Sequence, residues 1–139
     1  MQDLNDLWCF RLGSLSRKIY RYYNTHFSEY NITLPQSFVL FDLLKHDGSS
    51  IKDIAARVQL DPPAVTNFVD RLVNEDLMLR KEDPSDRRSV KVFLTQNGKD
   101  KAKQLLPIAV EFNKQMRNAM KNTDADAFEH ALSILEKTL

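Results

Sequence analysis

Two adjacent arginines, Arg87 and Arg88, end a short polar segment that begins at Asp83. Alternating apolar and polar residues follow, so the segment is predicted to be the turn of a β-hairpin that carries two guanidinium groups. A guanidinium binds most favourably where negative potential is concentrated, as it is in the minor groove of DNA. Lys91, on the strand that follows, is a candidate phosphate contact. The alternative is a solvated, charged turn.

A second group of polar side chains follows Pro62 and Pro63. Prolines are tolerated in the first turn of a helix, because the N–H groups there have no partner within the helix. The helix predicted over 62–75 exposes Pro62, Pro63, Thr66 and Asn67 in its N-terminal part, and all four are candidates for contact with DNA. Asn67 can form two hydrogen bonds with adenine, and Thr66 can donate to a phosphate or contact a thymine methyl group. The alternative is that both only solvate the helix.

Other residues are candidates for phosphate contacts, which would position the protein on DNA without reading its sequence. They are Gln36, Ser37, Arg71 and Lys52. The net charge of the chain is only +1, so any affinity for a polyanion must come from local clusters of basic residues. Such clusters lie over 80–91 and over 7–28, and the second of these segments contains no acidic residue.

Cys9 is the only cysteine, so the chain forms no internal disulfide, which is typical of a reducing compartment. A thiol that senses oxidants needs a lowered pKa and access to the oxidant. Arg11, Arg17 and Lys18 are candidates to stabilise its thiolate, and the alternative is an inert packing residue. Thiol-dependent catalysis is disfavoured, because His26 follows on the same predicted helix about 25 Å away at ~1.5 Å per residue.

The composition fits a single folded domain of 139 residues, of which 42% are apolar and 28% are charged. No apolar run approaches the ~18 residues of a membrane span. The first residues lack the basic start and apolar stretch of a signal peptide, so we expect a cytoplasmic protein without membrane contact. The histidines stand far apart without metal-ligand spacing. Neither a metal nor a cofactor is expected, and the chain is not expected to be an enzyme.

Apolar residues spaced three and four apart predict helices along the first half of the chain. Their ranges are 4–29, 35–46, 51–58 and 62–75. Thr33, the pair Ser49-Ser50, and Asp61 are predicted to cap the last three of them in turn. Two short helices joined by a tight turn, as at 51–58 and 62–75, form a helix-turn-helix.

The hydrophobic period then changes from 3.6 to 2, which predicts a small β-hairpin. Its predicted parts are strands over 79–82 and 89–94 and a turn over 83–88. A hairpin beside a helix-turn-helix is a wing. Thr95 is predicted to cap a further helix that Pro107 kinks, and Asp124 to open the last one. The fold class is therefore mainly α with a small hairpin.

The order and spacing of these segments resemble the MarR (multiple antibiotic resistance regulator) family of winged-helix repressors. The resemblance is carried by Leu34-Pro35-Gln36, by 51–55, by 60–72 and by 83–95. One departure is Asp76, at a place where the family has glycine after its recognition helix. Aspartate tolerates the left-handed conformation better than most residues. The resemblance implies that residues 34–98 form a winged helix-turn-helix that binds DNA.

In this family the outer helices form a dimer. The resemblance therefore implies dimerisation helices over 1–33 and 99–139, within a single domain over 1–139. The residues agree, because these helices carry more apolar side chains than one winged-helix unit can cover. Two recognition helices would then enter major grooves about 34–36 Å apart. We expect a homodimeric transcriptional regulator on a pseudo-palindromic operator in double-stranded DNA.

The resemblance also implies two forms of control. Family members bind small aromatic or phenolic ligands between the dimerisation helices and the winged-helix unit. Candidate lining residues are Tyr20, Tyr22, Tyr23, His26, Phe27, Phe38 and Phe41, and the alternative is ordinary core packing. The context of Cys9 is similar to the branch that senses organic hydroperoxides, in which a tyrosine at the place of Tyr23 binds the thiol. Leu34 stands where that branch has a second tyrosine.

The arginines of the hairpin bear on one more alternative. The resemblance assigns one of Arg87 and Arg88 to the minor groove and pairs the other with an acidic residue, Asp70 or Asp86, and it leaves open which is which. A winged-helix module that binds protein instead of DNA usually lacks these arginines and has an acidic recognition face. The presence of both arginines, and of Asn67, favours DNA.

Overall fold

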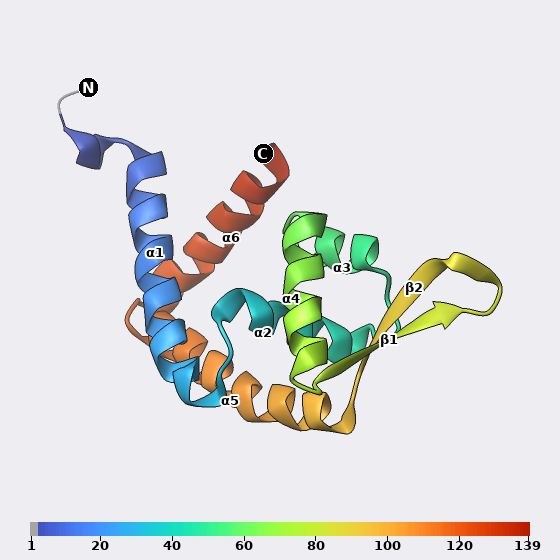
Figure 1. The fold of residues 1–139 in the computed structure, drawn as a ribbon. Helices are drawn as coiled ribbons and strands as arrows, with labels where there is room; N and C mark the ends of the chain where they lie inside the picture. The colour runs from blue at the N-terminus through green and yellow to red at the C-terminus, as the bar shows by residue number, and fades with distance from the viewer. Residues whose placement is uncertain (1–2) are drawn as a thin grey trace. The chain divides into compact units, whose positions relative to one another are not determined.

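The computed structural model describes residues 3–139, except for the side chain of Arg87. Helices dominate, and one antiparallel hairpin lies between α4 and α5 (Figure 1). The elements are η1 (Leu4–Asp6), α1 (Trp8–Phe27), η2 (Ser28–Tyr30), α2 (Leu34–Lys45), α3 (Ile51–Val58), α4 (Pro62–Asn74), β1 (Met78–Asp83), β2 (Asp86–Leu94), α5 (Gln96–Asn118) and α6 (Asn122–Thr138). The chain divides into two compact units, one ending at Leu106 and the other beginning at Pro107. This boundary lies inside α5, whereas the sequence predicts one domain with a functional division at residue 98.

The first predicted helix, over 4–29, is interrupted near its start. Leu7 is extended and separates the short 3-10 helix η1 from α1. The cause is local, because the side chain of Asp3 accepts from the Asn5 N–H while the Asp3 N–H donates to the Asp6 carboxylate at 3.1 Å. This capping box closes a separate turn. The remaining helix buries Tyr23 and Phe27.

Helices α2, α3 and α4 pack around side chains that have no exposed surface, namely Val39, Leu40, Leu43, Ile54, Val65, Val69 and Leu72. Thr33 and Gln36 form the capping box of α2, which confirms the predicted cap. The Ser50 hydroxyl accepts from the Asp53 N–H at 3.1 Å and caps α3, again as predicted. Asp61 is the N-cap residue of α4, but its side chain makes no capping hydrogen bond. The three helices confirm the predicted helix-turn-helix.

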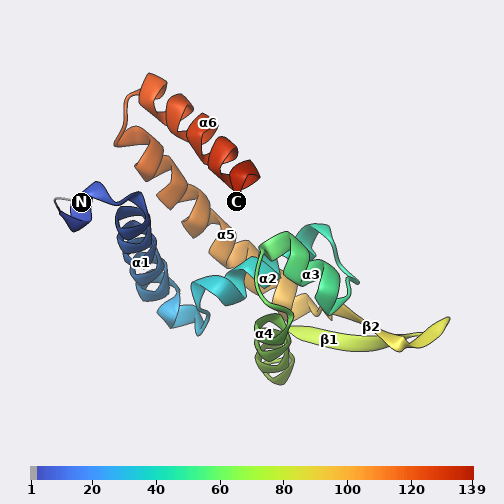
Figure 2. The same ribbon diagram turned by 90° about the horizontal axis from the view of Figure 1, so that it is seen from above.

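Strands β1 and β2 form a longer hairpin than the sequence predicts. Asp83 and Asp86 are paired across Pro84 and Ser85, so the turn is shorter than the predicted segment 83–88. The fixed φ of proline suits the start of such a turn. The register shifts next to Asp83, which marks a bulge close to the tip. Figure 2 shows the hairpin projecting away from α2, α3 and α4, which belong to the same unit.

Both ends of the hairpin meet at one junction with α5. Asp76 is left-handed with φ 60°, the conformation expected where it replaces glycine. The Thr95 hydroxyl donates to the Asp76 carbonyl at 2.7 Å and accepts from the Gly98 N–H at 3.0 Å, so it caps α5 as predicted. Gly98 is buried, and a Cβ there would lie 1.9 Å from the carbonyl oxygen of Leu77. This close contact holds α5 against the segment that follows α4.

The second unit contains the rest of α5 together with α6. Pro107 lies inside α5. Helix α6 begins at Asn122, two residues before the predicted start at Asp124, and Lys121 is its N-cap residue. Arg117 on α5 joins the two helices through ion pairs with Asp126 at 3.2 Å and Glu129 at 2.5 Å.

Replacing Gly98 by alanine tests the junction. At an uncrowded helix position, a change from glycine to alanine stabilises the helix by up to ~1 kcal/mol. At Gly98 the added methyl group would overlap a backbone oxygen, and such overpacking lowers the stability of the fold by about 1–3 kcal/mol. We expect Gly98→Ala to lower the free energy of unfolding by about 1–3 kcal/mol, measured by urea denaturation at a fixed protein concentration. Gly13→Ala is the matched control, since a Cβ there meets only the flexible end of Arg17 at 3.3 Å. Equal effects at the two glycines would contradict the close contact.

Candidate nucleic-acid interface

Helix α4 has two faces of opposite character. Val65, Val69 and Leu72 are completely buried, and they fix the rotation of the helix about its axis. The exposed residues of its first two turns are Pro62, Pro63, Thr66 and Asn67. The structure thus places all four residues on the outside of α4, as the sequence predicts.

The tip of the hairpin carries an exposed arginine. Arg88 donates its N–H to the Asp86 carboxylate at 3.0 Å, and its guanidinium forms no ion pair within the part of the chain that the structure describes. The side chain of Arg87 lies outside the described residues, so its contact stays a prediction. The Ser85 hydroxyl and N–H bind the Asp83 carboxylate at 2.7 and 2.9 Å. These two hydrogen bonds hold the pKa of Asp83 below its usual value, and the bond from the Ser85 hydroxyl has the larger effect.

Asp70 on α4 pairs with Arg80 on β1. Asp70 is predicted as a possible partner of Arg87 or Arg88, so its pairing with Arg80 differs from the expectation. An ion pair this exposed contributes only about 0–1 kcal/mol to stability. Its importance is its position, because it joins the helix that presents Asn67 to the hairpin that presents Arg88.

Two lysines face each other on the hairpin. Lys91 lies directly opposite Lys81 in the strand register, so their charges repel across the ladder. The Lys81 ammonium lies 5.3 Å from the centre of the Phe93 ring. Lys91 adds to the lowering of the pKa of Asp83. A phosphate would relieve the repulsion, so Lys81 joins Lys91 as a candidate contact that sequence reasoning missed, because it depends on strand register.

Arg71 is held at the C-terminal end of α4. Its Nε lies 3.3 Å from the Glu75 carboxylate, and its Nη2 donates to the Asn31 side-chain oxygen at 3.2 Å. The Asn31 amide donates to the same Glu75 carboxylate at 3.0 Å. These bonds attach the loop after α1 to α4. About half of the Arg71 side chain, 49%, stays exposed, so it can still reach a phosphate.

The predicted phosphate contacts of the Gln36 and Ser37 side chains are wrong. Gln36 is 4% exposed, and Ser37 is completely buried. The Gln36 side-chain oxygen accepts from the Thr33 N–H at 3.0 Å, and the Ser37 hydroxyl donates to the Leu34 carbonyl at 2.6 Å. Both side chains therefore form hydrogen bonds with backbone groups at the start of α2. Lys52, by contrast, is exposed on α3.

The structure separates the aromatic residues selected for a ligand cleft. Phe38 and Phe41 line an open groove of about 530 Å³ beside α3 and the end of the first unit, with Asp42, Leu44, Lys45, Arg57, Val58 and Leu106. Tyr23 is buried against Phe27, with ring centres 5.5 Å apart. Neither Tyr20 nor His26 lines the groove. The groove therefore contains only two of the seven candidates, because the other five lie on α1.

Cys9 is exposed in the first turn of α1. Tyr23 lies fourteen residues further along the same helix, about 21 Å away at ~1.5 Å per residue. A hydrogen bond between the two side chains of one chain is therefore excluded. The predicted pairing of Cys9 with Tyr23 requires a second copy of the chain.

A metal site and a membrane span are two alternatives that the described residues allow us to check. Among these residues, no group of three or more His, Cys, Asp or Glu side chains is arranged to hold a metal ion. None of the described helices is long and apolar enough to cross a membrane. The groups that the candidate interface does present are cations, amides and hydroxyls, which bind phosphates and base edges.

Helices α3 and α4 with the adjoining hairpin define a winged helix-turn-helix, a fold that places its second helix in the major groove of DNA. The family model of the MarR family matches residues 32–90. An organic hydroperoxide resistance transcriptional regulator of Bacillus subtilis (strain 168) is 30% identical over 121 residues, which cover 85% of this chain and 82% of that relative. The chain belongs to the MarR family, and it is a DNA-binding transcriptional regulator.

Two further similarities agree with this assignment. The HTH-type transcriptional regulator TtmR of Methylorubrum extorquens (strain PA1) is 32% identical over 98 residues, which cover 70% of this chain but only 50% of TtmR. The crystal structure of the S. aureus MepR–DNA complex matches with a TM-score of 0.91 at 21% identity, over 96% of this chain and 98% of the other. That likeness confirms the fold. The alternative of a protein-binding module finds no support among these relatives.

Proposed function

We propose that the protein is a repressor that binds a pseudo-palindromic operator as a homodimer. Helix α4 of each copy enters the major groove, and the hairpin reaches the neighbouring minor groove. One observation carries the proposal: Thr66 and Asn67 are exposed on α4, in the same unit as a projecting hairpin with an exposed Arg88. The protein must share a compartment with its DNA, so the proposal places it in the cytoplasm.

Each polar residue has a distinct role in this arrangement. The Asn67 carboxamide forms two hydrogen bonds with an adenine, and Thr66 contacts a thymine methyl group or a phosphate. Arg88, or its neighbour Arg87, inserts into the minor groove, where the negative potential is strongest. Lys91 binds the phosphate backbone and so fixes the position of the protein without reading sequence.

The homodimer is supported by large apolar side chains that each unit leaves exposed. In the first unit these include Leu4, Leu7, Trp8, Phe10, Leu12 and Leu15, and in the second Val110, Phe128, Leu132 and Ile134. Trp8, the largest of these side chains, is 71% exposed. Soluble monomers rarely leave apolar surface on this scale open to water. A second copy offers the same surfaces, as a two-fold contact requires.

Variants of α4 and of the hairpin tip test the proposed orientation. The probe is the duplex that the wild-type protein selects from a random pool, called the selected duplex below. Asn67→Ala should weaken binding by about 1–3 kcal/mol and relax the preference at one base pair in each half-site. The double variant Arg87→Ala/Arg88→Ala, called the wing-tip variant, should weaken binding by about 1–3 kcal/mol and flatten the dependence of affinity on salt. Fluorescence anisotropy titrations at several salt concentrations measure both effects.

The matched control for these variants is Lys103→Ala, because Lys103 is an exposed cation on α5, outside α4 and the hairpin. It should bind as the wild type does, and all variants should remain dimers. Unchanged affinity in both test variants would contradict the proposed orientation. If the wild-type protein selects no duplex from the random pool, the proposal of a specific operator is wrong.

We also propose that oxidation of Cys9 releases the DNA. The supporting observations are the exposure of the thiol and the similarity to a relative that is named for organic hydroperoxide resistance. The Cys9 thiolate attacks the peroxide O–O bond and takes one oxygen to become a sulfenic acid, and the other oxygen leaves as an alcohol after protonation. The alternative effector is a small aromatic ligand in the groove beside Phe38 and Phe41.

An organic hydroperoxide distinguishes these two modes of control. Cumene hydroperoxide should lower the affinity of the wild type for the selected duplex at least tenfold and leave Cys9→Ser unaffected, because serine cannot form the sulfenic acid. Anisotropy measured before and after treatment, with a reductant to reverse it, gives the result. Equal release from Cys9→Ser, or no release from the wild type, would contradict thiol sensing.

A further inference from the structure

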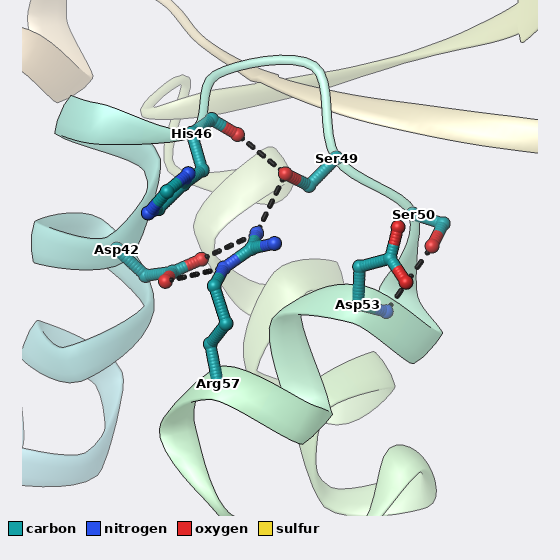
Figure 3. Close-up of polar contacts among 6 residues, drawn as sticks. All are labelled: Asp42, His46, Ser49, Ser50, Asp53 and Arg57. Atoms are coloured by element: carbon teal, nitrogen blue, oxygen red, sulfur yellow. Dashed lines mark hydrogen bonds and ion pairs between the residues drawn. The ribbon is translucent and has the colours of Figure 1, made fainter.

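Arg57 on α3 connects three parts of the winged-helix unit (Figure 3). Its Nε and Nη2 donate to the two carboxylate oxygens of Asp42 on α2, at 2.8 and 2.9 Å. The same Nη2 donates to the Ser49 hydroxyl at 2.6 Å, in the loop between α2 and α3. We call Arg57, Asp42 and Ser49 the Arg57 cluster. Its geometry is the parallel fork in which arginine binds a carboxylate most strongly.

Burial of the Asp42 side chain stabilises this arrangement. The side chain of Asp42 is only 9% exposed, and a carboxylate that has lost most of its water needs a cation. The hydrogen bond to Asp42 raises the pKa of Arg57 above its usual value. Arg57 is therefore charged and occupied, and it is not available as a phosphate contact.

The loop that Arg57 holds also holds the hairpin. The Gly48 N–H donates to the Val92 carbonyl at 2.9 Å, and the Val92 N–H donates to the Ser49 carbonyl at 2.8 Å. The Ser49 hydroxyl in turn donates to the His46 carbonyl at 2.5 Å. Ser49 thus binds Arg57 with its side chain and strand β2 with its backbone. The side-chain cluster and the root of the hairpin share one residue.

We propose that the Arg57 cluster positions the hairpin for DNA, although none of its three side chains contacts DNA. The cluster fixes the root of β2 relative to α2 and α3, and so determines where the wing-tip arginines lie. Arg88 is four residues from Val92, about 13 Å along an extended strand. A tilt at the root is therefore magnified at the tip. This inference rests on the proposed DNA-binding function and assigns it three positioning residues.

Two neighbouring serines provide a matched test. Ser49→Ala removes the hydroxyl that binds Arg57, whereas Ser50→Ala removes the hydroxyl that caps α3 through the Asp53 N–H. We expect Ser49→Ala to lower affinity for the selected duplex about threefold to tenfold. Ser50→Ala should change affinity less than twofold, and Ser49→Thr, which keeps the hydroxyl, should retain wild-type affinity.

The decisive readout is coupling to the two DNA-contacting regions. Ser49→Ala should cause no further loss in the wing-tip variant, because the arginines it positions are already gone. It should cause its full loss in the Asn67→Ala background. A general destabilisation of the fold would lower affinity equally in both backgrounds, and that result would overturn the positioning role.

Amide hydrogen exchange tests the cluster without DNA. Exchange at the Val92 N–H should speed up at least tenfold in Ser49→Ala and stay unchanged in Ser50→Ala, because only Ser49 connects the cluster to β2. Unchanged exchange at the Val92 N–H in Ser49→Ala would overturn the inference, even if the protein binds DNA as proposed. A wild-type protein that selects no duplex, with faster exchange in Ser49→Ala, would overturn the proposed function and the DNA role of the cluster while leaving its hold on β2 intact.

Discussion

Burial of Val65, Val69 and Leu72 determines which residues the protein can present to DNA. A helix as short as α4 is marginal on its own, so it depends on packing this apolar face against α2 and α3. Full burial of three side chains on one face leaves α4 a single rotation about its axis. Thr66 and Asn67 then lie on the outside. The stability of the unit and the exposure of the side chains that we propose to read bases are consequences of the same packing.

The hairpin follows a different constraint, because it is fixed at its root and open at its tip. Thr95 and Gly98 attach both of its ends to the start of α5, and Arg80 attaches β1 to α4. The loop at Ser49 adds a third attachment through β2. Arg88, near the tip, is exposed. The attached root gives the hairpin its direction, and the exposed tip would let an arginine adapt to the groove that we propose it enters.

Local signals are sufficient to predict the helix-turn-helix and the caps of α2, α3 and α5, since each depends on a few neighbouring residues. The left-handed Asp76 is expected only from the resemblance, which has glycine at that place. The expected exposure of Gln36 and Ser37 to phosphate is wrong. Helix α2 is apolar on most sides, so periodicity does not identify its outer face. The ion pair of Arg57 with Asp42 was missed, since residues on two helices leave no periodic signal. The sequence therefore predicts which polar residues are exposed better than it predicts the side chains that hold them in place.

Hydroxyl-radical footprinting of the wild-type protein on its selected duplex tests the central claim most directly, namely that two copies place α4 in successive major grooves with the hairpins in the flanking minor grooves. This arrangement predicts two symmetric blocks of protection, with centres about 10–10.5 base pairs apart. Outer minor-groove protection should disappear in the wing-tip variant while the inner protection remains. A single protected block, or outer protection that persists without the arginines, would contradict the account.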